Sequence, residues 1–167
     1  MRISHALPVA ALAATALLAS AGSAGAETRA PEGLLHVQTF AGKCVDVADG
    51  SPADHAPLIQ YTCHGGANQQ FRLVPVGDGR FQVRTFAGKC VDVADNSAAD
   101  HAPLIQYTCH GGANQQFRLV PVGDGRFQVR TFADKCVDVA DNSAADRARL
   151  IQYTCHGGAN QLFRPYS

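Results

Sequence analysis

Short segments with alternating apolar and polar residues recur along the chain and predict β-strands. In the middle of the chain this pattern is found at Phe81–Phe86, Cys90–Ala94, Leu104–Cys109 and Gln116–Val120. A period of two is typical of strands because successive side chains point to opposite faces of a sheet. Gly, Asn and Asp residues that favour turns separate the four segments. No segment has a convincing helical pattern, so the sequence predicts an all-β fold.

These four strands form one unit of an internal repeat. Segments 35–72, 81–118 and 127–164 align without a gap, and matching positions are 46 residues apart. The first two segments differ at five of 38 positions, and the last two differ at four. Four strands in each of three units predict about twelve strands in all. The units are expected to span about residues 34–79, 80–125 and 126–167.

Three nearly equal units favour closure around a threefold axis. A solenoid normally ends in atypical capping repeats, whereas the end repeats of this chain match the middle one. Closure also removes exposed sheet edges. The last unit ends early, at Ser167, so its final strand is expected to be short.

Residues 1–26 have the layout of a secretory signal peptide. A positive charge near the start is followed by an apolar run at Ala6–Ala19 and by small residues at Ala24–Ala26. The alternative is an uncleaved anchor, but a transmembrane helix needs about 20 apolar residues. Cleavage leaves 141 residues, enough for one secreted, soluble domain at 34–167 after a short leader at 27–33.

Charge and cysteine content restrict the function further. After cleavage the chain has 13 basic and 14 acidic side chains, which argues against a nucleic-acid partner or a charged membrane surface. Its six cysteines and its leader favour disulfides in an oxidising compartment. Threefold symmetry allows each first cysteine of a unit to pair within its own unit or with one of the other two. The local choice is the simplest: Cys44–Cys63, Cys90–Cys109 and Cys136–Cys155.

The local pairing also predicts which side chains are neighbours on the sheet. If Cys90 and Cys109 face each other on antiparallel strands, Asp92 stands opposite Tyr107, about 5 Å away at Cβ. Each unit then holds a carboxylate beside an aromatic ring, open to solvent. A carboxylate accepts hydrogen bonds from sugar hydroxyls, and the ring covers the apolar face of a sugar. The equivalent pairs are Asp46 with Tyr61 and Asp138 with Tyr153.

Two amide side chains follow the Gly-Gly turn of each unit. Amides both donate and accept hydrogen bonds, as sugar hydroxyls do. Taken singly, such residues can serve only their own backbone, and a tyrosine can serve only packing. Threefold repetition of the set beside a disulfide favours up to three sugar sites. The amide pairs are Asn68 and Gln69, Asn114 and Gln115, and Asn160 and Gln161.

At these residues the chain resembles the ricin-B-like lectin family. Three motifs carry the resemblance, each present three times between residues 34 and 167: Lys-Cys-Val-Asp-Val, Ile-Gln-Tyr-Thr-Cys and Gly-Ala-Asn-Gln. The resemblance implies a β-trefoil, with a closed barrel and a hairpin cap. It places the family's sugar-binding aspartate, stacking aromatic and polar pair on the residues named above. Galactose-type or xylan-like glycans are the ligands that it implies.

The sequence departs from the family pattern in two ways. The tryptophan of the family's Gln-x-Trp triplet is phenylalanine in every unit, which should affect core packing more than sugar contact. The third unit also has Arg147 and Arg149 where the second has His101 and Pro103, and Asp134 where the second has glycine. We hypothesise that the two arginines alter the third site, beside Tyr153, or favour an acidic sugar there.

Other chemistries are less well supported. His64, His110 and His156 each follow a cysteine, but oxidised cysteines provide no thiolates, so neither a metal nor a cofactor is expected. A hydrolase needs two carboxylates in different environments at one place, whereas the aspartates repeat equally, so no enzyme activity is expected. The main alternative to a monomeric, non-catalytic lectin is a protein-binding or inhibitory trefoil. An inhibitor needs one distinctive loop, and this chain has three similar sites.

Overall fold

The computed structural model describes residues 33–166. The predicted signal peptide and residues 27–32 of the predicted leader lie outside the described residues. The described part contains twelve strands and six 3-10 helices of three residues each, which agrees with the predicted number of strands. The strands are β1 (His36–Gln38), β2 (Cys44–Val47), β3 (Leu58–Tyr61), β4 (Arg72–Gly77), β5 (Arg80–Arg84), β6 (Cys90–Val93), β7 (Leu104–Tyr107), β8 (Arg118–Gly123), β9 (Arg126–Arg130), β10 (Cys136–Val139), β11 (Leu150–Tyr153) and β12 (Arg164–Tyr166).

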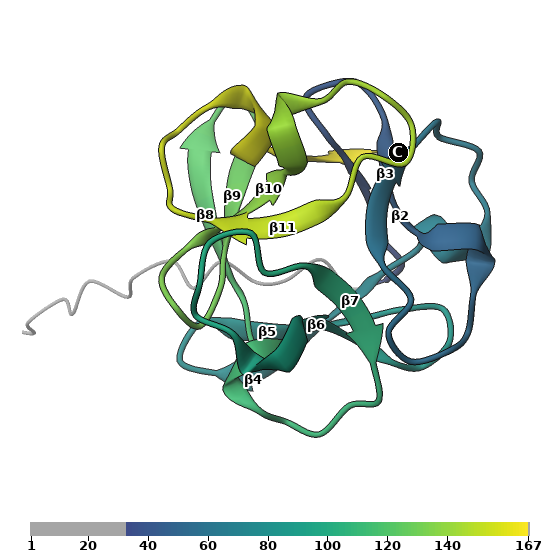
Figure 1. The fold of residues 1–167 in the computed structure, drawn as a ribbon, viewed down its shortest axis with the longest axis vertical. Helices are drawn as coiled ribbons and strands as arrows, with labels where there is room; N and C mark the ends of the chain where they lie inside the picture. The colour runs from purple at the N-terminus through teal and green to yellow at the C-terminus, as the bar shows by residue number, and fades with distance from the viewer. Residues whose placement is uncertain (1–32, 167) are drawn as a thin grey trace, which may run out of the picture.

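The strands form three four-stranded antiparallel sheets, arranged around the viewing axis of Figure 1. Their orders are β12-β1-β2-β3, β4-β5-β6-β7 and β11-β10-β9-β8. The first sheet joins both ends of the described chain, because β12 pairs with β1 from His36 opposite Tyr166 to Gln38 opposite Arg164. The expected short last strand is therefore present, and it pairs with β1 over three residue pairs.

The predicted closed barrel does not form as one continuous sheet. Adjacent sheets are joined by single antiparallel bridges, Leu35 with Phe71, Phe81 with Phe117 and Phe127 with Phe163. Each bridge has two backbone hydrogen bonds of 2.7–2.9 Å. The bridges do not extend because the residue after each phenylalanine begins a strand that pairs elsewhere, as β4 does with β5 and β12 with β1.

The other end of the molecule is held together by contacts between units. Isolated bridges connect β3, β7 and β11 to residues of the loops that precede the equivalent strands. A fully buried glutamine in each of these strands reinforces the contact. The side-chain amide of Gln106 donates to the carbonyl oxygens of Ser51 and Ala53 in the first unit, at 2.7 and 2.8 Å. The loop of one unit is thus fixed against an edge strand of the next sheet, here β7.

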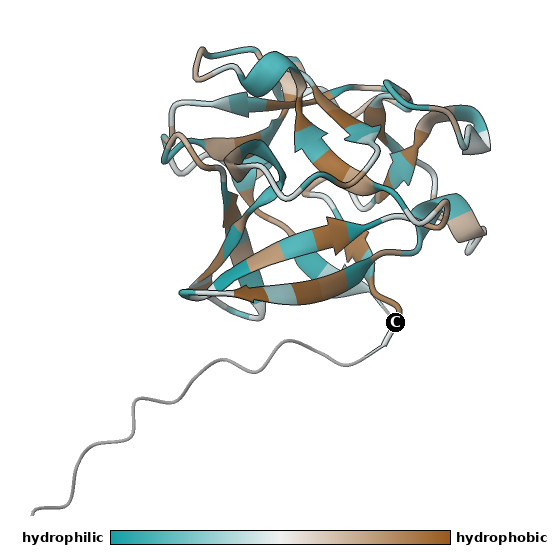
Figure 2. Ribbon diagram, turned by 90° about the horizontal axis from the view of Figure 1, so that it is seen from below, coloured by the Kyte–Doolittle hydropathy of each residue, from teal (hydrophilic) through white to brown (hydrophobic). Residues whose placement is uncertain are grey.

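The core lies where the three units meet. Apolar residues of the strands face inward, and the alternation of apolar and polar positions along them is visible in Figure 2. Phe71, Phe117 and Phe163, which replace the family tryptophan, are 1–2 % exposed. Burial of one phenylalanine side chain contributes about 2 kcal/mol to the stability of the folded protein. The core retains an apolar cavity of about 70 Å³ lined by these three rings and by Val, Leu and Phe residues of all three units.

The local disulfide pairing is confirmed. Cys44–Cys63, Cys90–Cys109 and Cys136–Cys155 each join residues 19 apart, with Cα atoms 5.0–5.1 Å apart. The predicted strand register is wrong. Cys90 stands opposite Tyr107, and Asp92 stands opposite Ile105. The reason is that β7 ends at Tyr107, so the second cysteine reaches its partner from the following loop and not from the ladder.

Candidate functional site

The aspartate of each unit is the centre of a hydrogen-bonded cluster. In the middle unit, Asp92 Oδ1 accepts a hydrogen bond from Asn114 Nδ2 at 2.9 Å, and Oδ2 accepts one from Gln115 Nε2 at 2.8 Å. Asp46 and Asp138 have the equivalent partners. All three aspartates are only 2–3 % exposed, so the expectation that they are open to solvent is wrong. Their carboxylates are desolvated because the amides fold over them.

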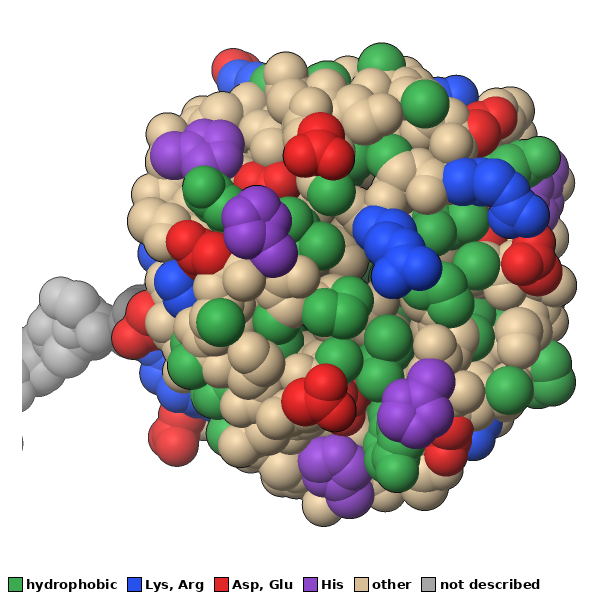
Figure 3. Space-filling model, in the orientation of Figure 1, with side chains coloured by type: hydrophobic (Ala, Val, Ile, Leu, Met, Phe, Trp, Pro, Cys, Tyr) green, Lys and Arg blue, Asp and Glu red, His purple; other side chains and the backbone are tan. Residues whose placement is uncertain are grey.

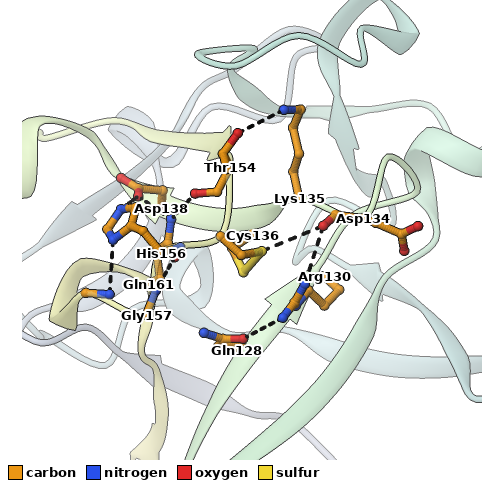
Figure 4. The surroundings of a disulfide bond; sticks show 12 residues. Gln128, Arg130, Asp134, Lys135, Cys136, Asp138, Thr154, His156, Gly157 and Gln161 are labelled. Carbon is orange, nitrogen blue, oxygen red and sulfur yellow. Dashed lines mark hydrogen bonds and ion pairs between the residues drawn. A yellow bond between two sulfur atoms is a disulfide. The ribbon is translucent and has the colours of Figure 1, made fainter.

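A histidine completes the cluster from its solvent side. His110 Nδ1 accepts the backbone N–H of Gly112 at 3.1 Å, and Nε2 lies 3.3 Å from Asp92 Oδ2. Because Nδ1 accepts a hydrogen bond, the ring N–H is on Nε2, and it donates a hydrogen bond to the carboxylate. Glycine is needed here because an added Cβ at Gly112 would lie 2.7 Å from the imidazole and 2.8 Å from Asn114 Oδ1. His64 and His156 stand in the same relation to Asp46 and Asp138. Figure 4 shows the third cluster beside its disulfide.

The two predicted amides differ in position. Gln69, Gln115 and Gln161 are fully buried, and Gln115 also donates to Thr108 O and accepts the His110 N–H. These glutamines hold the aspartate and the loop and do not reach solvent. Asn114 lies at the edge of the pocket and also donates to Val93 O. Both amides come from the 3-10 helices after the Gly-Gly turn, of which the middle one is Ala113–Gln115.

Burial changes the acidity of the first aspartate. Desolvation raises the pKa of Asp46 above its usual value, and the hydrogen bonds from Gln69, Asn68 and His64 oppose this shift. A carboxylate that is held by three donors retains acceptor capacity, because an ionised carboxylate has about four lone-pair sites. The aspartate can therefore orient its own donors and still accept a hydrogen bond from a ligand at the pocket floor.

The tyrosine lies on the same face of the sheet as the aspartate, diagonally and not directly opposite. Tyr107 is paired with Cys90, two residues along β6 from Asp92, so all three side chains share one face. Tyr61 is 36 % exposed, and Tyr107 and Tyr153 are half-buried. The predicted combination of acid and aromatic ring is thus present, with the ring at the surface and the acid beneath.

A pocket lies over the cluster of the first unit and another over that of the middle unit. The pocket of the middle unit has a volume of about 510 Å³, and its lining includes Asp92, Tyr107, His110, Asn114 and Asp95. The pocket of the first unit has a volume of about 360 Å³, and its lining includes Asp46, Tyr61, His64, Asn68 and Asp49. We call these the middle pocket and the first pocket. The third unit has the equivalent arrangement of Asp138, Tyr153, His156 and Asn160, and we call this place the third pocket.

Each pocket also receives a side chain from the preceding unit around the ring. His55 of the first unit lines the middle pocket, with its ring centroid 5.0 Å from that of Tyr107. His101 stands 5.0 Å from Tyr153 in the same way. Arg147 of the third unit lines the first pocket. The hypothesis that Arg147 alters the third site is therefore wrong, because the loop points across the unit boundary. Arg149 pairs its backbone with Ile59 of the first unit and is exposed.

Sequence reasoning missed these crossing residues and the pocket role of the histidine after each second cysteine. The crossing was hidden because the loop is adjacent in sequence to the tyrosine of its own unit. The histidines were visible as a threefold repeat, but the sequence showed them only beside the cysteines. Within residues 33–166, no group of three His, Cys, Asp or Glu side chains is arranged to hold a metal ion. The same stretch contains no helix with the length and apolar character of a membrane span.

Comparison with known structures shows the same fold elsewhere. A designed threefold-symmetric protein, ThreeFoil, is 41% identical, with a TM-score of 0.78 over 80% of this chain and 98% of its own. An exo-β-1,3-galactanase from Clostridium thermocellum is 33% identical, also with a TM-score of 0.78, over 81% of this chain and 30% of its own. The ricin B-like lectin of Macrolepiota procera, solved in complex with lactose, shares the fold at 15% identity and a TM-score of 0.69, over 80% of this chain and 94% of its own.

No curated protein matched the sequence. A family profile did match: the Ricin-type beta-trefoil lectin domain aligns with residues 32–163, which include all three aspartate clusters and all three disulfides. The alignment therefore covers most of the chain and all of the described strands except β12. This match shows that the chain belongs to the ricin-type β-trefoil lectin family.

Proposed function

We propose that this protein binds glycans without catalysis, with one sugar in each of up to three pockets. The observation that carries the proposal is the repeated arrangement of a half-exposed tyrosine over a buried, hydrogen-bonded aspartate. The tyrosine ring offers an apolar surface for the C–H face of a sugar. The aspartate and Asn114, with their counterparts, offer polar atoms at the pocket floor for hydroxyl groups.

The cluster is built to keep its geometry before a ligand arrives. Asp92 is held by two amides and a histidine, and Gln115 is itself held by Thr108 and His110. A pocket ordered in this way loses little conformational freedom on binding, which favours recognition of a small polar ligand. We assign contact with the sugar to the aspartates, tyrosines and asparagines. We assign Gln69, Gln115 and Gln161 a positioning role, because both ends of each side-chain amide are bonded within the protein, to the aspartate, to a threonine carbonyl and to the histidine N–H.

Galactose-type or xylan-like glycans are the proposed ligands, and the protein is proposed to act outside the cell as a monomer. A single sugar contact is often near millimolar, about −4 kcal/mol. Three pockets on one rigid body can raise avidity for a glycan surface by about 10²- to 10⁴-fold. This makes adhesion to, or targeting of, a polysaccharide or glycoprotein glycan the best-supported role.

A glycan array probed with the disulfide-bonded protein tests the proposal. We expect binding to galactose- or xylose-containing glycans. Substitution of all three tyrosines, Tyr61, Tyr107 and Tyr153, by alanine should abolish it, whereas substitution by phenylalanine should retain most of it because the ring remains. Binding that survives the alanine variant, or a wild-type array with no signal, would contradict the proposal. Release of reducing sugar from the bound glycans would contradict binding without catalysis.

A further inference from the structure

The three pockets differ at the side chain that each receives from the preceding unit. His55, His101 and Arg147 occupy the same place in their loops, with φ angles of 68°, 68° and 70°. The backbone N–H of each donates to a glutamine carbonyl of the next unit, at 2.8–2.9 Å. The loops therefore share one backbone conformation. At this place the pockets differ in the side chain, a histidine in two of them and an arginine in the first. The first pocket also has Gly50 where the middle pocket has Asn96.

The loop that holds Arg147 is firmly anchored to the first unit. The buried side chain of Gln60 donates to Ser143 O and Ala145 O, both at 2.8 Å. Asp146 accepts hydrogen bonds from Lys43 Nζ and from the backbone N–H of Thr62, at 2.6 and 2.8 Å. These contacts lie directly before Arg147 in the chain. The guanidinium is consequently presented to the first pocket from a fixed base.

Arg147 also makes different contacts inside the first pocket from those of the histidine in the middle pocket. In the middle pocket, the ring of His55 stands at 69° to that of Tyr107. In the first pocket, Nη1 and Nη2 of Arg147 donate to Asp49 Oδ1 at 2.9 and 2.6 Å. Figure 3 shows histidines close to acidic groups at the upper left and at the bottom of this face, and basic side chains beside acidic and hydrophobic ones on the right.

These differences alter the charge that a ligand meets. With neutral histidines, the middle pocket holds two negative groups, Asp92 and Asp95. The first pocket holds two as well, Asp46 and Asp49, but Arg147 offsets one of them. A sugar that carries a carboxylate is repelled less by the first pocket than by the middle one. Arginine can also bind a carboxylate through two parallel N–H groups.

Building on the proposed function, we propose that the first pocket accepts uronic-acid sugars and that Arg147 determines this specificity, whereas the other two pockets select neutral sugars. The ion pair with Asp49 does not prevent this. Its side chains are 58% and 70% exposed, and exposed ion pairs are weak. A guanidinium has five N–H groups, and the contact with Asp49 uses two donor atoms. One unit charge at about 4 Å in water changes affinity about fivefold.

Site-resolved NMR titration of the full disulfide-bonded protein tests this inference. The side-chain amides of Asn68, Asn114 and Asn160 report on the first, middle and third pockets. Two matched ligand pairs are used: galactose with galacturonic acid, and a xylo-oligosaccharide with its glucuronic-acid-substituted form. We expect the ratio of acidic to neutral affinity to be about fivefold higher at Asn68 than at Asn114 and Asn160.

Three variants locate the effect. R147H should lower the ratio at Asn68 to that of the other pockets, and R147K, which keeps the charge, should retain most of it. H55R should raise the ratio at Asn114, since an arginine is already accommodated at the equivalent backbone position. If the ratio of acidic to neutral affinity is equal at all three amides, or if R147H leaves that ratio unchanged at Asn68, this inference is overturned. The proposed function is not affected by either result. If no neutral or acidic sugar binds any pocket, the proposed function fails and this inference fails with it.

Discussion

Replacement of Asp92 by alanine separates the structural and the binding roles of the cluster. The substitution removes the acceptor of Asn114 Nδ2 and Gln115 Nε2, at 2.9 and 2.8 Å, and the partner of His110 Nε2. Each amide keeps one other acceptor, Val93 O or Thr108 O, so each loses one of its two bonds. A buried donor left without an acceptor costs about 1–3 kcal/mol.

The alanine variant also removes a buried carboxylate. Burial of a charged group is unfavourable, so its removal offsets part of the cost of the lost hydrogen bonds. We therefore expect the free energy of unfolding to fall by about 2 kcal/mol, well inside the usual total of about 5–15 kcal/mol. The protein should stay folded. With a slope of about 4 kcal/mol per molar guanidinium chloride, the midpoint should fall by about 0.5 M. Far-UV circular dichroism gives the midpoint, and tyrosine fluorescence is a second probe because the chain has no tryptophan.

Binding to the same variant should be lost in one pocket only. The NMR signal of Asn114 should stop responding to sugar, while those of Asn68 and Asn160 should respond as in the wild type. Asp92→Asn is the matched control: it keeps one acceptor oxygen and should lose about half as much stability. An unchanged midpoint together with unchanged binding at the middle pocket would refute the account of the cluster. Loss of the fold would assign Asp92 a purely structural role.

Three further predictions follow from particular residues. Asp134 has a φ of 56° at a position that is glycine in the other two units. Because glycine adopts a positive φ without strain, Asp134→Gly should raise the free energy of unfolding by about 0.5 kcal/mol. Chemical denaturation measures this change, and a decrease would contradict the prediction. The hydrogen bond from Lys89 holds the pKa of Asp54 below 3.8. The ionised Asp54 therefore stabilises the folded protein above pH 3.8, and this stabilisation is lost as the pH falls through the pKa of Asp54 in the folded state. Asp54→Asn should therefore reduce the loss of stability seen in urea midpoints below pH 3.8, and an unchanged acid slope would count against the ion pair. Gly112→Ala should weaken sugar binding in the middle pocket about fivefold, because the added Cβ displaces His110. A titration in which the affinity at Asn114 equals that of the wild type would exclude this.

The repeat and the cysteines made much of the fold predictable. Nearly identical units required three equivalent sheets, and the symmetric pairing within units, as in Cys90–Cys109, is the one that forms. Strand register was not predictable from the disulfide, because a disulfide fixes the distance between two Cα atoms and not their place in a ladder. Tyr107 therefore lies opposite Cys90, although the aspartate and the tyrosine still share a face because side chains alternate.

The environment of the site depended on tertiary contacts that a linear pattern does not show. Asp92 is buried because Asn114 and Gln115, more than 20 residues away, fold over it. The assignment of Arg147 to the first pocket depended on the path of a loop across the unit boundary. That path is set by the buried Gln60, which holds the carbonyls of the neighbouring loop.

The most direct test is a crystal structure of the disulfide-bonded protein with a galactose- or xylose-containing glycan. The account predicts a sugar ring over Tyr107 or its counterparts, with ring carbons within about 4 Å of the tyrosine and a hydroxyl bonded to Asn114 or Asp92. A sugar bound elsewhere, with these three pockets empty at saturating ligand, would contradict it.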